Sequence, residues 1–138
     1  MRKLLPFMKF LEKEAGFRFD IEKFEHQLRV QKYVFISKFF GFNHGYPYSL
    51  YVRGPYSSTL ADDYYKLADT YSLYGGVYTK ELGGFNAKKF IEVIEGKDGK
   101  WLEIAATILS VYDRYREKFH GDEEAVQQLP NNHHFLVI

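Results

Sequence analysis

The 138-residue sequence contains no cysteine, and this absence excludes several kinds of chemistry. A chain without thiols has no thiol nucleophile, no thiolate ligand for zinc and no disulfide framework. A single domain of this length buries roughly two thirds of its unfolded surface, so it needs neither a disulfide nor a metal to fold. Because disulfide-free chains are typical of reducing compartments, we expect a cytoplasmic protein.

Long apolar runs are missing too. No segment approaches the length required to cross a bilayer, so we expect no membrane partner. The N-terminal MRKLLPFMKFLEKEAGF has a basic start and a short apolar patch, as secretory signals do. Lys9, Glu12, Lys13 and Glu14 interrupt that patch, and no small-residue cleavage site follows it. We therefore expect a soluble, intracellular chain.

Neither sign of charge is in excess. The sequence has 19 Lys and Arg against 18 Asp and Glu, a formal net charge of +1. Proteins that bind duplexes usually have a stronger basic surface, because phosphate neutralisation supplies most of their affinity. The charge balance therefore disfavours nucleic acid as a partner.

Catalytic motifs are absent as well. The sequence has no Gly-x-Gly-x-x-Gly, Walker or Gly-x-Ser-x-Gly motif, and none of its five histidines has a helical metal-ligand partner. Asp62 and Asp63 are adjacent, so on a helix their carboxylates point about 100° apart and do not converge on one ion. We predict no catalytic residue, no cofactor and no metal site, and hence a protein that is not an enzyme.

What the sequence does contain is aromatic residues, unevenly distributed. Nine of the 13 Phe lie between Phe7 and Phe42, whereas nine of the 12 Tyr lie between Tyr46 and Tyr78. Phe is best buried outright, whereas Tyr suits half-exposed surfaces and interfaces because its hydroxyl can meet water or a partner. We infer a Phe-rich segment that builds the core, followed by a Tyr-rich segment that presents side chains.

Helical spacing predicts the N-terminal part of the fold. A first helix has apolar residues at i, i+3, i+4 and i+7 and stops at Gly16. A second helix runs from an Asp20 cap to Gly41, with Gln31 as the one polar member of its stripe. The apolar stripe of the first helix is Leu4, Phe7, Met8 and Leu11, and that of the second is Ile21, Phe24, Leu28, Phe35 and Phe39.

The C-terminal part is also predicted to be helical. Ser57 or Ser58 caps a third helix with Asp62 and Asp63 in its first turn, where carboxylates favour the helix dipole. Asn86 caps a fourth helix that ends at Glu95, a short helix lies between Asp122 and Pro130, and residues 130–138 form a tail. The expected buried residues are Leu60, Tyr64, Leu67 and Tyr71, then Phe90 and Ile94, then Trp101, Ala105, Ile108, Tyr112, Tyr115 and Phe119.

One small β element interrupts the helices. Tyr48, Leu50 and Val52 alternate with their neighbours, which predicts a strand over 48–53 that Gly54-Pro55 ends. A lone strand needs a partner, and VYTKEL at 77–82 is the candidate. The predicted fold is mainly α: a single compact helical domain over 1–138, of about five to six helices with a small two-stranded β element.

Two groups of polar residues each have a structural and a functional interpretation. In the first group, one interpretation is that Arg29 and Lys32 face solvent and that Gln31 lies at the edge of the core. The other is that Gln31 and Arg53 form a buried polar link between helix and turn. In Arg53-Gly54-Pro55-Tyr56-Ser57-Ser58, turn chemistry explains most residue types. Arg53 beside the helix start at 57–58 would alternatively form a small anion site.

Two segments, LRVQKYVF at 28–35 and GFNHGYPYSLYVRGPYSSTLADDYYKL at 41–67, resemble the YwgA-like and SocA-like (Panacea, phage-associated GepA) group. WLEIAAT at 101–107 is similar to a later helix of that group. The resemblance implies a helical protein that binds partner proteins, as antitoxins and adaptors do, without established catalytic residues. Phe35 stands where the group usually has Tyr. The residues that match the group are Arg29, Gln31, Lys32, Gly54, Pro55, Tyr56, Ser57, Leu60 and Asp63.

These observations give three functional hypotheses. The first is a non-enzymatic protein-interaction module, antitoxin-like or adaptor-like, as a monomer or a homodimer. The second is a nucleic-acid-binding, winged-helix-like regulator, and the third is an enzyme that holds an anionic substrate at Arg53 and the 57–58 helix start. The first would use Tyr48, Tyr51, Arg53, Tyr56 and Tyr65. The second requires one common face for Lys3, Lys9, Lys13, Lys23, Arg29, Lys32 and Lys38.

Overall fold

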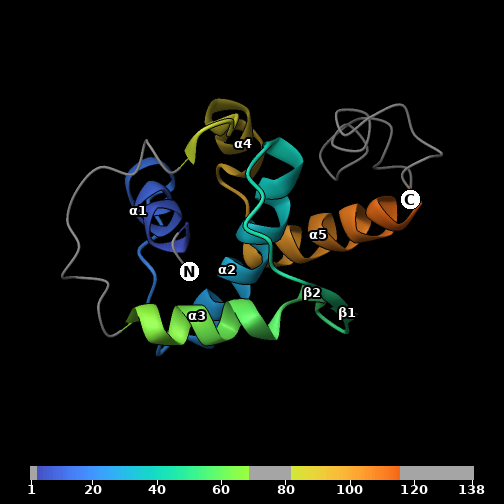
Figure 1. Cartoon of the computed structure of the whole chain (residues 1–138), viewed down its shortest axis with the longest axis horizontal. Coiled ribbons are helices and arrows are strands. Elements are labelled where there is room, and N and C mark those ends of the chain that lie inside the picture. The colour runs from blue at the N-terminus through green and yellow to red at the C-terminus, as the bar shows by residue number, and fades with distance from the viewer. Residues whose placement is uncertain (1–2, 69–81, 116–138) are drawn as a thin grey trace.

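Helix α2 (Phe24–Ser37) lies at the centre of the molecule, between α1 (Leu4–Ala15) and α5 (Gly99–Arg114) (Figure 1). All eight residues from Val30 to Ser37 are buried, whichever way their side chains point. A surface helix has one apolar stripe, whereas a helix surrounded by other elements is buried all round. This central position explains why Gln31 and Lys32 are buried together with their apolar neighbours.

The computed structural model describes residues 3–68 and 82–115. Within them the chain forms five α-helices and one two-stranded antiparallel sheet, so the predicted mainly α single domain with a small β element is confirmed. Around the central helix lie the 3₁₀ turn Lys38–Phe40, β1 (Ser49–Tyr51), β2 (Gly54–Tyr56), α3 (Ser58–Ala68) and α4 (Ala87–Ile94).

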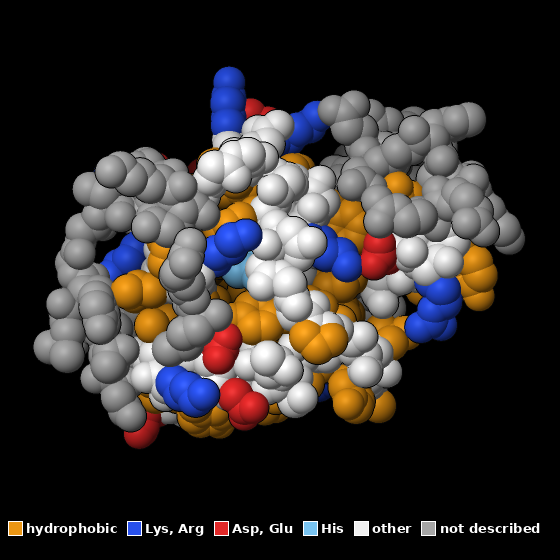
Figure 2. Space-filling view, viewed as in Figure 1, with side chains coloured by type: hydrophobic (Ala, Val, Ile, Leu, Met, Phe, Trp, Pro, Cys, Tyr) orange, Lys and Arg blue, Asp and Glu red, His pale blue; other side chains and the backbone are white. Residues whose placement is uncertain are grey.

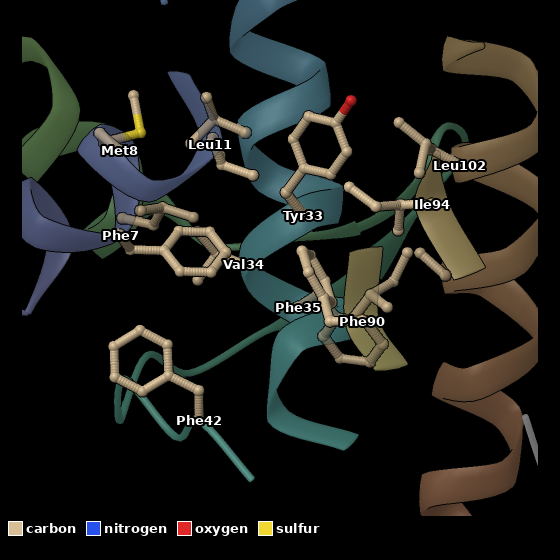
Figure 3. Packing of buried hydrophobic residues seen from close by; sticks show 14 of the residues in the cluster. Phe7, Met8, Leu11, Tyr33, Val34, Phe35, Phe42, Phe90, Ile94 and Leu102 are labelled. Carbon is tan, nitrogen blue, oxygen red and sulfur yellow. The ribbon is translucent and has the colours of Figure 1, made fainter. Parts of the chain in front are cut away.

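Phenylalanine is the most frequent residue type in the core, and most of the core phenylalanines come from the Phe-rich segment that the aromatic distribution predicts to build it. Figure 3 shows Phe7 of α1, Phe35 of α2 and Phe90 of α4 converging on one cluster. The predicted stripe of α1 is buried in full, and Gly16 ends that helix in the left-handed conformation at φ 67°. Among the described phenylalanines, Phe85 is half-buried and Phe24 is exposed, at 62%.

Phe24 is exposed because α2 begins later than predicted. Asp20 does not cap the helix: its side chain accepts from the Glu22 amide and its carbonyl from the Lys23 amide, which forms a separate turn. The helix therefore starts at Phe24, and the side chain of this first residue stays exposed. Its other end agrees better with prediction, since the 3₁₀ turn leads to Gly41 at φ 92°.

Helix α3 has its predicted cap and inner face but not its predicted first turn. The Ser57 hydroxyl accepts from the Leu60 amide at 3.1 Å, and Leu60, Tyr64 and Leu67 are buried. Because the helix starts at Ser58, Asp62 and Asp63 lie in its second turn and not beside its free amides. Tyr71 lies outside the described residues.

Helix α4 has its predicted cap, and the buried face of α5 differs in part from its prediction. The Asn86 side chain accepts from the Lys89 amide at 3.2 Å, and Phe90 and Ile94 point inward. In α5 the buried residues are Leu102, Ala105, Ala106, Leu109 and Tyr112. The predicted stripe is therefore only partly correct, since Trp101 and Ile108 are half-buried and Tyr115 is 47% exposed. Phe119, the short helix after Asp122 and the tail at 130–138 lie outside the described residues.

The β element differs most from its prediction. Gly54 and Pro55 do not end the strand: they start β2, which pairs with β1 in the register Ser49–Tyr56, Leu50–Pro55 and Tyr51–Gly54. The strand partner is therefore the next segment of the chain, and the strand predicted at 48–53 is a tight hairpin. The predicted partner at 77–82 lies outside the described residues except for Leu82, which is in a 3₁₀ segment.

Candidate functional site

The hairpin β1–β2 rests on α2 and α5 through its second strand, while its turn points away from the core (Figure 1). Only Val52 and Arg53 connect the paired residues Tyr51 and Gly54, so the turn has two residues. Two-residue hairpin turns usually contain Asn, Asp or Gly. Here the glycine follows the two turn residues instead: Gly54 adopts the left-handed conformation at φ 96°, and glycine is favoured at the fourth position of a common β-turn.

Gln31 fixes the base of this hairpin. Its side-chain oxygen accepts from the Ser57 amide at 2.8 Å, and its side-chain nitrogen donates to the Ser57 carbonyl at 2.9 Å. Both residues are buried, so the two hydrogen bonds satisfy backbone groups that water cannot reach. The predicted buried link between the helix and the turn is thus present on the Gln31 side.

Lys32 supplies the next contact along α2. Its ammonium donates to the Pro55 carbonyl at 2.9 Å, and the residue is only 2% exposed. Burial lowers the pKa of Lys32 to about 8, and the neighbouring charges of Glu103 and Arg53 act in opposite directions. The interpretation in which Lys32 faces solvent is wrong, because the hairpin covers this side of α2.

Gly54 permits the close approach of hairpin and helix. Its φ is 96°, a conformation that residues with a Cβ rarely adopt. A Cβ at this position would lie 3.1 Å from Thr107 Oγ1 and 3.2 Å from Lys32 Cε. The Gly-Pro pair therefore has a packing role at the start of β2 in addition to its turn chemistry.

Arg53 is not part of the buried link. Its side chain is 60% exposed and forms an ion pair with Glu103 of α5 at 3.2 Å. The helix start at 57–58 is occupied by Gln31 and by its own serine cap. The predicted anion site between Arg53 and that helix start is therefore not formed, because Arg53 turns toward α5 instead.

Arg29 is half-buried rather than solvated. It donates to the Tyr33 hydroxyl at 2.6 Å and pairs with Glu25 at 3.3 Å. Burial by itself would lower the pKa of Arg29, but the bonds to Tyr33 and Glu25 raise it overall. Arg29 also donates to the Lys97 carbonyl, which links α2 to the turn before α5.

Asp63 connects α3 to the loop that precedes the hairpin. It accepts from the Tyr46 hydroxyl at 2.6 Å. Burial alone would raise the pKa of Asp63, but this hydrogen bond contributes to a net lowering. Asp63 therefore connects a loop to α3 through this hydrogen bond, a role different from the predicted compensation of the helix dipole.

The predicted partner-binding tyrosines fall into two groups. Tyr48 packs its ring against Phe35 at 4.9 Å and its hydroxyl is buried, while Tyr56 is half-buried against the core. Tyr51 and Tyr65 are 61% and 54% exposed. Tyr65 lies about two turns along α3, where its hydroxyl donates to Gln27. Of the five predicted residues, only Tyr51 and Arg53 therefore lie together at the end of the hairpin.

The end of the hairpin exposes two further residues that are not among the predicted partner-binding residues. Leu50 is 42% exposed and Val52 is 99% exposed, so Leu50, Tyr51 and Val52 form a continuous apolar tip, which we call the hairpin tip. Hydrophobic side chains, in orange, lie on the surface over the hairpin in Figure 2. Their alternation predicts one strand over 48–53, and the exposure of Val52 follows from the turn that replaces the end of that strand.

Glu103 was also missed. It pairs with Arg53 of the turn and with Lys100 at 3.6 Å, one turn into α5. Nothing in the local sequence distinguishes it from other helical glutamates, because its role depends on a partner fifty residues away.

The basic residues proposed for a nucleic-acid surface do not form one free face. Lys32 is buried, Lys38 pairs with Asp113 at 2.8 Å, and Arg29 is engaged with Glu25. Those three positive charges are compensated or covered, which further disfavours the nucleic-acid hypothesis.

Over residues 3–68 and 82–115, no helix is long and apolar enough to cross a membrane. Comparison with protein-family models, curated proteins and solved structures gives no match for this chain.

Proposed function

We propose that this chain is a protein-interaction module that contacts its partner through the hairpin tip. The observation that carries this proposal is Val52, an apolar side chain that is 99% exposed in a turn where polar or flexible residues are usual. Hydration does not favour an apolar side chain there. Burial against a partner would account for it, because it removes apolar surface from water.

The surroundings of the tip support this function. Tyr51 and Arg53 flank Val52, and Tyr and Arg are enriched at the energetic centres of protein interfaces. In the described part of the chain, the outer edge of β1 has no strand beside it, so a partner segment can pair there as well. The base of the hairpin is held by Gln31 and Lys32, so little freedom is lost on binding.

The resemblance to the YwgA-like and SocA-like group agrees with this proposal. Its characterised members act as antitoxins or adaptors, so the expected partner is a protein encoded close to the gene of this chain. The proposed activity is binding without catalysis.

The proposal is tested by affinity capture of the products of neighbouring genes, followed by titration calorimetry with the purified partner. Tyr51→Ser and Val52→Ser remove apolar surface from the hairpin tip without touching its base. We expect each to weaken binding about tenfold or more, because interface centres lose that much on truncation.

Phe24→Ser is the matched control. Phe24 is as exposed as Tyr51 but lies at the start of α2, so its replacement should leave the affinity unchanged. If the tip variants bind as tightly as the wild type, or if Phe24→Ser weakens binding equally, the hairpin tip is not the contact surface. Sedimentation of the free chain shows whether the partner is a second copy.

A further inference from the structure

A cavity of about 260 Å³ opens where the hairpin, the middle of α2 and the start of α5 meet. Four basic side chains line it: Arg29, Lys32, Arg53 and Lys100. The first residue of α5, Gly99, lines it too, so the positive end of that helix dipole adds to the same field. The volume is below that of most drug-sized pockets and suits a small group.

The acidic residues around the cavity already have partners. Glu25 pairs with Arg29, and Glu103 pairs with both Arg53 and Lys100. Asp98 caps α5 by accepting from the Trp101 amide at 2.9 Å. None of them forms an ion pair with Lys32 among the residues that the structure describes.

Lys32 is therefore a buried ammonium whose only hydrogen bond here is to the Pro55 carbonyl. An ammonium has three donors, so two N–H groups remain for a ligand or water. Nearby, Arg29 Nε is also buried without a partner in the described residues. Glu103 offsets only part of the effect of burial on the Lys32 charge, because the pKa of Lys32 stays below its ordinary value, and an anion in the cavity would stabilise that charge further.

We propose that this cavity is a binding site for an anionic oxygen group, a carboxylate or a phosphate, held by Lys32 and Arg29 at the start of α5. Arg53 and Lys100 lie at its exposed side, where they attract the anion. The two ligand chemistries share the same oxygen acceptors, and both fit donors that point into one small volume. This site does not depend on a protein partner at the hairpin tip.

The test is a nuclear magnetic resonance titration of the ¹⁵N-labelled chain with inorganic phosphate and, separately, with acetate. Sodium chloride at equal ionic strength is the reference for general salt effects. We expect saturable shifts of the Gly99 and Lys100 amides with at least one of the two anions. The anion that binds more tightly identifies the ligand chemistry.

Two variants make the result specific. Lys32→Met should weaken binding about tenfold or more, because it removes a charged hydrogen-bond donor to the anion. Lys100→Glu changes an exposed side chain that the fold does not require, and should also weaken binding. Lys88→Met on the exposed face of α4 removes the same charge elsewhere and should have no effect.

Binding should also depend on pH. Lys32 faces Arg29 and Glu25 of α2, Arg53 of the hairpin, and Asp98, Lys100 and Glu103 at the start of α5. Since the pKa of Lys32 is about 8, the free site loses its central charge as the pH rises past that value, so affinity falls. Absence of saturable shifts, or equal binding by Lys32→Met and the wild type, would overturn the proposal.

Discussion

At the scale of single residues, His44 shows how burial lowers the pKa of a histidine. Its imidazole packs among the rings of Phe7, Phe42 and Tyr46, with the nearest centroid 4.3 Å away. Neither ring nitrogen has a partner in the described residues. Burial, together with the nearby charge of Lys3, lowers the pKa of His44 to about 3.

The first prediction concerns the stability of this site in acid. Because the folded pKa of His44 lies below its ordinary value of 6.5, the unfolded chain takes up a proton first as the pH falls. Relative to His44→Phe, the wild type should lose about 1.4 kcal/mol of unfolding free energy per pH unit below pH 6.5. Urea denaturation between neutral pH and pH 4 measures this difference. Parallel stability profiles for the two proteins would contradict the prediction.

At the scale of secondary-structure elements, the hairpin and α5 pack closely because Gly54 has no side chain. Replacement by Ala adds a methyl group 3.1 Å from Thr107 Oγ1 to a backbone at φ 96°. Both the conformation and the contact are unfavourable. The conformational penalty applies at any glycine with such a φ, whereas the packing penalty arises only where another element lies this close.

Gly54→Ala should therefore cost about 2–4 kcal/mol of unfolding free energy, the sum of a conformational and a packing penalty. Gly96→Ala is the control, because Gly96 has a similar φ of 72° but nothing within 4 Å of the added methyl. That variant should lose only about 1–2 kcal/mol. Equal losses at both positions would show that packing at Gly54 is unimportant.

Elements with local signals could be predicted from the sequence, and elements defined by distant contacts could not. The C-terminal end of α1 follows from Gly16, and the N-terminal end of α4 follows from Asn86. Each of these residues acts on the backbone next to it. The Gly-Pro pair predicts a strand end. In β2, however, Pro55 contributes only its carbonyl, to Lys32. The burial of Lys32 and the Arg53–Glu103 pair depend on elements that meet only in the folded chain.

At the scale of the whole molecule, α2 is the element around which the others pack (Figure 3). Phe35 and Phe24 lie on the same helix but differ greatly in burial, at 2% and 62% exposed. They therefore form a matched pair for measuring what the central position of α2 contributes.

Phe35→Ala should cost about 3–5 kcal/mol of unfolding free energy, because it leaves a cavity beside Phe39 and Tyr48. Phe24→Ala should change stability by no more than about 0.5 kcal/mol, as exposed substitutions usually do. Thermal or urea unfolding of both variants provides the comparison. If Phe24→Ala were the more damaging change, the start of α2 would have to be covered in solution.

The anchoring of the hairpin has a consequence for how this surface can change. Gln31 and Lys32 hold the hairpin through the backbone of Ser57 and Pro55, and neither of them bonds to a side chain at positions 50–52. Those three positions are therefore free to diversify while the framework stays constant, as in the variable loops of antibodies. Under the proposed function, substitution in three neighbouring codons would change the recognition specificity, and the same positions suit a randomised library for selecting binders.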